Sequence, residues 1–167
     1  VVNKNGTYYT TDYDLSNHYE EGFSVLEKYE PEKVWSAVFF DAEQQFYYLK
    51  RFRFENVVRH TLFIGETEGS YLIALSGEKR PRFEVVFGGR YESRPAEVIV
   101  ADEFIAEKSY KARGKRVTTY EVKQINEIEP LDSGEEESEE TASTDIDFEI
   151  TNPDMLSDET QMKLDFE

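Results

Sequence analysis

The sequence contains no cysteine and only two histidines, His18 and His60. Without thiols the chain has no disulfide framework, no zinc site built on thiolates and no cysteine nucleophile. Neither histidine has a partner at metal-ligand spacing, so we expect both to be surface, strand or turn residues. We therefore expect no catalytic site, no metal and no cofactor in this fragment.

Long apolar runs are missing as well. The longest apolar stretches, such as 71–75, are far shorter than the roughly 20 residues that a membrane-spanning helix needs. No positively charged segment followed by an apolar run opens the chain, so a signal peptide is not indicated. We expect a cytoplasmic protein without a membrane partner. Because the chain begins with Val1 rather than methionine, we also expect it to be a piece of a longer protein.

Basic residues are scarce overall, with 19 against 36 acidic residues and a net charge of −17. Taken as an average, this charge disfavours nucleic acid and membrane surfaces as partners. The charge is unevenly placed, because residues 131–167 hold 14 acidic and one basic residue. Residues 50–123 hold 15 basic and 11 acidic residues. The body of the chain is therefore nearly neutral, with a basic half.

Helical periodicity is absent from residues 1–130, which are rich in β-branched and aromatic residues. Two hairpins are predicted, and the Asn5-Gly6 turn indicates a third, weaker one at 1–11. The segments of the two main hairpins are 34–40 with 46–54 and 70–76 with 81–87. Further strands are predicted at 23–29, 57–64, 96–100, 104–108 and 121–128.

Short strands with frequent turns predict an all-β fold, either a sandwich, a barrel or a propeller-like array of sheets. The composition changes after Pro130, where five of the seven residues in the run 134–140 are acidic. Such a run buries too little apolar surface to offset its ordering entropy. We therefore predict a folded body at 1–130 and a disordered acidic tail at 131–167.

Two clusters of basic residues stand out in the body. In the first, alternation along a strand places Arg51 and Arg53 on one face, and Lys50 with Phe52 on the other. Guanidinium groups at a strand end suit phosphate binding, and they equally suit an edge strand protected by charge. The second cluster, 108–116, has five basic and no acidic residues, and Gly114 permits a close approach to a partner. The alternative is a solvated loop. Because five basic residues in one loop stand out in so acidic a chain, we favour phosphate binding.

The same residues carry a family resemblance. Three segments, KVWSAVFFD…FYYLKRF from 33 to 52, PRFEVVFG from 81 to 88 and FIAEKSYKARGKRVTTYEV from 104 to 122, resemble the C-terminal region of the A subunit of bacterial type IIA topoisomerases. The version is that of Bacteroidetes topoisomerase IV and gyrase A subunits, and the likeness spans 5–130. It implies a partial β-pinwheel, a propeller-like disc of antiparallel, hairpin-based blades whose basic rim binds and bends DNA. The chain has room for two or three blades of about 40–50 residues each.

The resemblance implies a non-catalytic module that presents duplex DNA for ATP-dependent strand passage by a parent topoisomerase, an isomerase. In that family the catalytic tyrosine lies upstream and ATP hydrolysis belongs to the B subunit. The B subunit and the second A subunit would therefore be partners through parts outside this chain. The loop 111–116 has a single glycine, unlike the glycine-rich basic box of gyrase, which favours topoisomerase IV. The predicted DNA-binding residues are Lys50, Arg51, Arg53, Arg80, Arg82, Lys108, Lys111, Arg113, Lys115 and Arg116.

The tail suggests two further hypotheses. Tethered acidic residues at 132–149 would compete with DNA for the basic face, which makes the tail autoinhibitory. The end of the chain, with Gln161, Leu164 and Phe166, resembles the Q-x-x-L-x-F peptide that docks on the replication sliding clamp, although coincidence explains three fixed positions equally well.

A different function is compatible with the same strands. The alternative is a β-rich protein-interaction or ligand-binding module without a DNA role. Its binding face would consist of aromatic residues such as Trp35, Tyr47, Tyr48 and Tyr71. Salt dependence separates the two functions, because phosphate contacts release counterions and an aromatic pocket does not.

Overall fold

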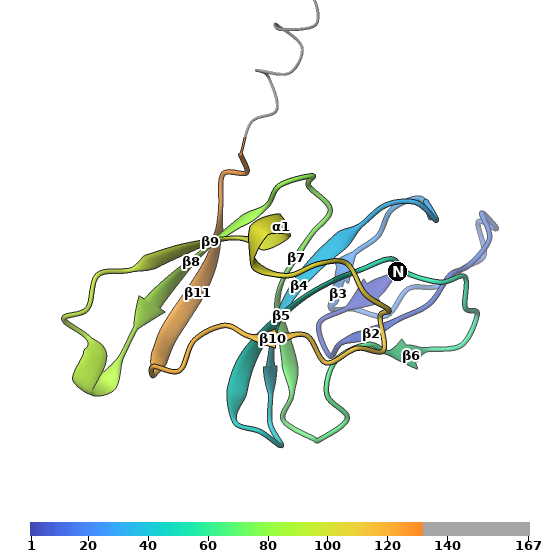
Figure 1. The fold of residues 1–167 in the computed structure, drawn as a ribbon. Helices are drawn as coiled ribbons and strands as arrows, with labels where there is room; N and C mark the ends of the chain where they lie inside the picture. The colour runs from blue at the N-terminus through green and yellow to red at the C-terminus, as the bar shows by residue number, and fades with distance from the viewer. Residues whose placement is uncertain (132–167) are drawn as a thin grey trace, which may run out of the picture. The chain divides into compact units, whose positions relative to one another are not determined.

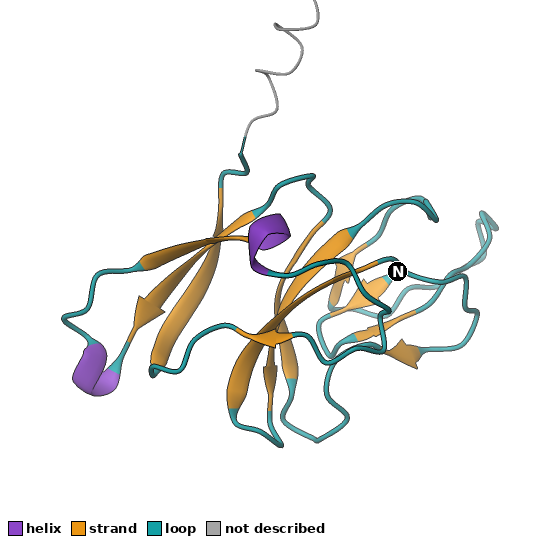
Figure 2. Ribbon diagram, in the orientation of Figure 1, coloured by secondary structure: helices purple, strands orange, loops and turns teal. Residues whose placement is uncertain are grey.

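The computed structural model describes residues 1–131, which fold into short strands joined by turns and loops (Figure 1). Eleven strands, one four-residue helix and one 3-10 turn make up the regular structure of this region (Figure 2). The strands form three antiparallel sheets, which confirms the prediction of a mostly β fold. Within residues 1–131 the sheets do not close into a propeller, and no helix is long and apolar enough to cross a membrane. The predicted disorder of the tail falls outside the described residues.

Sheet A lies near the N-terminus. It contains, in spatial order, β3 (Phe23–Val25), β1 (Val2–Asn3), β2 (Thr7–Tyr8) and β6 (Thr61–Leu62). β1 and β2 form the hairpin predicted at 1–11, and its turn requires Gly6, whose φ is +82°. A Cβ at Gly6 would collide with the side chain of Ile64. The strands predicted at 23–29 and 57–64 are present only as the short β3 and β6. Residues 26–29 and 58–60 are exposed, irregular chain, whereas Phe63 and Ile64 are buried in the core without belonging to a strand.

Sheet B lies in the middle of the molecule (Figure 1). It contains β10 (Lys115–Arg116), β5 (Phe46–Phe52), β4 (Trp35–Asp41) and β7 (Tyr71–Ser76). β4 and β5 form the first predicted hairpin, with Val38 opposite Leu49. β10 arrives from far along the sequence and pairs with the other edge of β5, where Lys115 lies opposite Leu49. The second predicted basic cluster therefore lies beside β5, the strand that contains most of the first cluster.

Sheet C contains β11 (Val122–Ile128), β8 (Arg82–Phe87) and β9 (Glu97–Val100). The 3-10 turn η1 (Gly89–Tyr91) lies between β8 and β9. The hairpin predicted from 70–76 and 81–87 is wrong, because β7 pairs with β4 whereas β8 pairs with β9 and β11. Both segments are strands, but the chain between them crosses from sheet B to sheet C.

The strand predicted at 104–108 is also wrong. Phe104 ends the short helix α1 (Ala101–Phe104), and the following residues are irregular apart from one bridge between Glu107 and Arg51. The apolar side chains of Phe104 and Ile105 pack against a core cluster instead of alternating across a sheet. Their aromatic and β-branched character therefore reflects burial rather than strand pairing.

Two hydrophobic clusters make up the core, and sheet B takes part in both. Trp35, Phe39 and Phe52 point into the first cluster, together with Tyr8 of sheet A. Val38 and Leu49 alternate with them and point into the second, which includes most of the buried side chains of sheet C. Both faces of β4 are therefore buried, which explains why its sequence is a nearly continuous apolar run.

Candidate nucleic-acid interface

The basic loop, residues 108–116, lies along the edge of β5 that does not pair with β4. It carries five of the ten predicted DNA-binding residues. At its start, the amide of Lys108 donates a hydrogen bond of 2.8 Å to the carbonyl oxygen of Arg51. At its end, β10 pairs with the middle of β5. Both ends of the loop are thus hydrogen-bonded to one strand of sheet B, which fixes the path of the loop between them.

Gly114 allows the loop to lie directly on β5. Its φ is +95°, in the left-handed region that side-chain-bearing residues rarely adopt. A Cβ at this position would lie 2.6 Å from the carbonyl oxygen of Leu49 and 2.9 Å from Cβ of Lys50. The predicted role of Gly114 was a close approach to a partner, and the approach observed here is to the protein's own strand.

Lys50 lies beneath the loop rather than on the surface, with only 3% of its area exposed. Its ammonium donates hydrogen bonds to the carbonyl oxygens of Phe63, Tyr110 (2.6 Å) and Ala112 (3.2 Å). Burial lowers the pKa of Lys50 from 10.5 to about 8. A phosphate cannot reach this ammonium, so we replace the predicted DNA contact of Lys50 with a role in supporting the loop.

Tyr110 provides a second internal anchor. Its ring is buried in the first core cluster, and its centroid lies 5.7 Å from that of Tyr8 in an edge-on arrangement. The loop is therefore held by strand pairing, by a buried ammonium and by a buried aromatic side chain. Sequence reasoning missed both anchors. For Lys50 the signal was present, since a lysine alternates there with Phe52 and Tyr48 on a strand face that is otherwise apolar.

The cations of the loop remain available to a ligand. None of the five forms an ion pair with a carboxylate of residues 1–131. Lys108, Lys111, Arg113 and Lys115 are exposed, and Arg116 is half-buried. Lys115 lies over the ring of Phe104 at 4.3 Å and Arg116 over that of Phe46 at 3.3 Å. Aromatic rings can hold cations in place without neutralising them, so the loop keeps its positive charge.

The strand cluster is partly neutralised by its neighbours. As alternation predicts, Arg51 and Arg53 lie on the face opposite Lys50, and both reach the segment that leads into the basic loop. Arg53 forms ion pairs with Glu32 (2.5 Å) and Glu107 (2.8 Å). Arg51 is half-buried and its Nη1 lies 3.4 Å from the carbonyl oxygen of Ile105.

Arg80 and Arg82 belong to a different part of the molecule. Arg80 forms ion pairs with Asp102 (2.9 Å) and Glu103 (2.8 Å) of helix α1. Arg82 lies on β8, and its Nε donates to the carbonyl oxygen of Glu129 over 2.6 Å. Because two carboxylates neutralise Arg80, it is a weaker candidate for a phosphate contact than the cations of the loop. Arg82 has only a backbone partner, as does Lys115, whose Nζ donates to the carbonyl oxygen of Phe104 over 3.3 Å.

A second surface, which we call the aromatic groove, lies beside sheet A. The groove has a volume of about 980 Å³. Its aromatic lining residues are Tyr8, Tyr9, Tyr13, Tyr19, Tyr29, Trp35, Phe54 and His60. Tyr13 is 82% exposed, and the rings of Tyr9 and His60 stack at 4.3 Å. Part of one wall comes from the acidic segment, residues 12–32, which carries seven acidic residues and one lysine. Three of those acidic residues, Asp12, Glu27 and Glu30, line the groove, as does Lys28.

The groove differs from the aromatic face that the sequence suggested. Trp35 and Tyr48 are buried in the first core cluster and Tyr47 is half-buried, so only Tyr71 of the four predicted residues is exposed. The four therefore do not form one binding face. The available signal for the groove was the spacing of tyrosines among the acidic residues of the N-terminal region.

Comparison with known proteins gives one match. The family model for the topoisomerase C-terminal domain of Bacteroidota matches residues 1–129. This range contains all three sheets, as well as the basic loop and the groove. No curated protein and no solved structure matches the chain.

Proposed function

We propose a DNA-binding role for this chain, which belongs to the topoisomerase C-terminal domain family of Bacteroidota. The observation that carries the proposal is the state of the basic loop. Five cations occur within nine residues, they have no carboxylate partner in residues 1–131, and their backbone is fixed on sheet B. A fixed array of exposed cations suits the phosphate backbone of duplex DNA, because little conformational entropy is lost on binding.

The contacts that we propose are with phosphates rather than bases. Lys108, Lys111, Arg113 and Lys115 provide exposed charge, and Arg116 extends the array at its end. The loop presents no helix or ribbon to enter a groove, so we expect little dependence on DNA sequence. Arg51 and Arg53 border the array and join it when their present partners are displaced.

In finer detail, we propose that the chain is a non-catalytic module of a topoisomerase IV A subunit, with gyrase as the alternative. Its three sheets would be blades of a partial pinwheel, with domain limits at 1–130 and 131–167. The bound duplex would be bent and presented for ATP-dependent strand passage in the cytoplasm. The B subunit and the second A subunit would be contacted through other parts of the protein. The single glycine of the loop supports topoisomerase IV.

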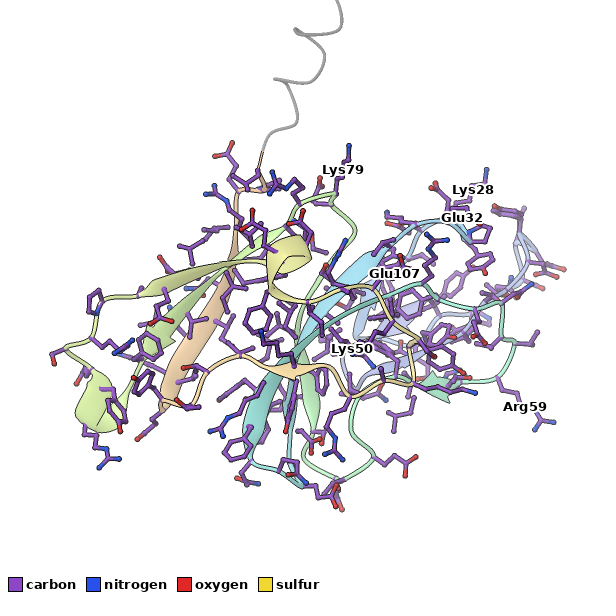
Figure 3. All side chains as sticks on the ribbon, in the orientation of Figure 1. Lys28, Glu32, Lys50, Arg59, Lys79 and Glu107 are labelled. Atoms are coloured by element: carbon purple, nitrogen blue, oxygen red, sulfur yellow. The ribbon has the colours of Figure 1, made fainter. Side chains whose placement is uncertain are left out.

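The DNA-binding proposal is tested with the full chain and a duplex of about 30 base pairs across a salt series. For four or five phosphate contacts we expect log K to fall with log salt with a slope of about −4. Replacing Arg113 and Lys115 by alanine should reduce that slope by about 2. The matched control replaces Lys28 and Arg59, two exposed cations away from the loop, and should leave the slope unchanged (Figure 3). Equal effects of the two double variants would contradict the proposal.

Autoinhibition by the tail is a separate proposal, which rests on charge alone. The hypothesis concerns 132–149, outside the described residues, where carboxylates at high local concentration would compete with phosphates. Replacing the glutamates of 135–140 by glutamine in the full chain should tighten DNA binding, most strongly at low salt. Unchanged affinity at low salt would contradict it.

The clamp-like peptide is tested on its own. Gln161, Leu164 and Phe166 also lie outside the described residues, and the sliding clamp stays a proposed partner. A synthetic peptide of 158–167 should bind the clamp, and substitution of Leu164 and Phe166 should abolish that binding. No binding by the unmodified peptide would rule out the proposal.

The aromatic groove favours a second candidate function, the docking of a positively charged peptide. Of the nine large apolar side chains that are exposed in residues 1–131, five line this groove: Tyr13, Tyr19, Leu26, Tyr29 and Val58. Exposed apolar side chains gathered in one hollow are typical of binding sites, and the acidic wall selects a basic ligand. A peptide alternating lysine and leucine should bind, and one alternating glutamate and leucine should not. Replacing Tyr13 by serine should weaken the binding, whereas the same change at Tyr71, outside the groove, should not.

A further inference from the structure

Lys50 is the only lysine or arginine that is buried in residues 1–131. We infer that Lys50 is a positioning residue for DNA binding, whose buried ammonium holds the backbone of the basic loop so that the loop's own cations face the solvent. This inference rests on the proposed function, because it assigns to the loop the DNA contact proposed above.

The hydrogen-bonding capacity of Lys50 matches its surroundings. An ammonium group has three N–H donors, and three carbonyl oxygens surround it. Two of them, from Tyr110 and Ala112, belong to the loop, and the third, from Phe63, follows β6 of sheet A. Lys50 itself is part of β5 in sheet B. One side chain therefore connects the loop to two sheets.

No carboxylate takes part in this arrangement. Within residues 1–131, Lys50 forms no ion pair, and its other neighbours are the rings of Phe39, Phe52 and Phe63, with centroids 5.1–5.7 Å from Nζ. Burying an ammonium in such a site is unfavourable unless its donors are all satisfied. An apolar side chain would suit the core better. The lysine therefore makes sense as the donor for loop carbonyls that would otherwise be buried without partners.

The orientation of the loop depends on these bonds. The carbonyl groups of Tyr110 and Ala112 are turned inward to Lys50, while the neighbouring side chains of Lys111 and Arg113 are exposed. Figure 3 shows Lys50 inside the body of the molecule, in contrast to Lys28 and Arg59 at its periphery. Removing the ammonium would release the inward carbonyls and, with them, the fixed outward direction of the phosphate-binding cations.

The test replaces Lys50 by methionine in the full chain and measures two quantities. Trypsin cuts after lysine and arginine, so cleavage within 108–116 under native conditions reports opening of the loop without any DNA. We expect cleavage to become at least about tenfold faster, since each carbonyl left unsatisfied costs enough to shift an equilibrium by that factor. We expect DNA affinity to fall about five- to tenfold at an unchanged salt slope, because every loop cation is still present.

Two further variants keep the test decisive. Lys50→Gln retains two N–H donors and should give intermediate effects even if the methionine variant folds poorly. Val85→Ala, in the second core cluster, controls for a general loss of stability. If the loop of the Lys50 variants opens no faster than that of a Val85→Ala protein of equal stability, the inference is overturned.

Failure of the inference is distinguishable from failure of the proposed function. If Arg113→Ala weakens DNA binding while the Lys50 variants bind normally with an opened loop, positioning by Lys50 is refuted and the loop remains the DNA site. If neither Arg113→Ala nor the Lys50 variants affect DNA binding, the DNA role of the loop itself is wrong.

Discussion

The basic loop and the acidic segment are both mostly exposed, and both are irregular apart from β10 in the loop and β3 in the segment, but they are built in opposite ways. The loop has five positive charges and no negative ones, and it is anchored from below by Lys50, Tyr110 and strand pairing. The acidic segment has seven negative charges and one lysine. Its β3 pairs with β1, and Tyr29 donates a hydrogen bond to the carbonyl oxygen of Phe54. The hydrogen bonds at 12–17 are local, such as those from Asn17 to Asp12. We expect the loop, whose backbone is satisfied by the core, to be more rigid than the part of the acidic segment that relies on local hydrogen bonds.

This difference matches the two proposed ligands. Phosphates on a duplex have a regular spacing, so a fixed array of cations gains affinity from its rigidity. A peptide in the aromatic groove takes a shape that depends on its side chains, so a wall with few internal contacts can adjust to it. Opposite charges on the two surfaces also keep each ligand away from the other site.

Two glycines, one in each region, show how closely each region packs against the rest of the protein. Gly114 in the loop and Gly22 in the acidic segment have nearly the same φ, +95° and +97°. A Cβ at Gly114 would meet the backbone of β5, whereas a Cβ at Gly22 would have no atom within 4 Å. Gly22→Ala should therefore reduce the free energy of unfolding by about 1 kcal/mol, from backbone strain alone. Gly114→Ala should reduce it by about 2–4 kcal/mol, because strand contacts must also shift.

Urea denaturation of both variants measures these values. Gly114→Ala should also weaken DNA binding, since the loop would lift from β5, and Gly22→Ala should not. Equal losses of stability would mean that the contact between the loop and β5 is looser than the structure indicates, and the contrast between the two regions would then disappear.

The sequence predicts much of this contrast, but only where the information is local. Alternation along 50–54 correctly separates Arg51 and Arg53 from Lys50 and Phe52. It does not say what covers the opposite face. In the structure the basic loop, some 60 residues away in the sequence, covers that face, so Lys50 is buried rather than exposed.

The hairpin predicted from 70–76 and 81–87 failed for a related reason. Each segment has the pattern of a strand. The strand that it pairs with depends on which strand edges are free in the fold, and β7 pairs with the free edge of β4. The groove was missed because its walls come from segments around 12–30 and 54–60 that meet only in the folded chain. Patterns within a segment therefore predicted faces and strands, whereas pairing and cavities required contacts between distant segments.

The pH dependence of stability tests whether Lys50 is buried beneath the loop. The folded chain releases the proton of Lys50 near pH 8, whereas the unfolded chain keeps it up to its ordinary pKa of 10.5. The unfolded state therefore binds more protons in this window, and the free energy of unfolding rises with pH. The neutral amine keeps two N–H donors and avoids the cost of burying a charge.

The measurement compares the protein with its Lys50→Met variant by urea denaturation at about pH 7.5 and about pH 9.5. The stability of the protein relative to the variant should increase by on the order of 1–2 kcal/mol over this interval. Higher pH is avoided because burial raises the pKa of Tyr8 to about 12 in the folded chain. The unfolded chain then loses the proton of Tyr8 first, which lowers the free energy of unfolding as the pH rises. A difference that stays constant with pH would contradict a buried ammonium.

The smallest expected effect concerns an ion pair between the acidic segment and the strand cluster beside the loop. Glu32 of the acidic segment pairs with Arg53 at the end of the strand that carries the loop, and both side chains are substantially exposed. An exposed pair contributes little, so Glu32→Gln should change the free energy of unfolding by less than about 0.5 kcal/mol. The same change frees part of the charge of Arg53 beside the loop, and DNA affinity at low salt should rise about twofold. Glu30→Gln is the matched control, because Glu30 has the same charge but no ion pair within residues 1–131. If both variants raise affinity equally, the gain comes from net charge alone, and Arg53 takes no part in binding DNA.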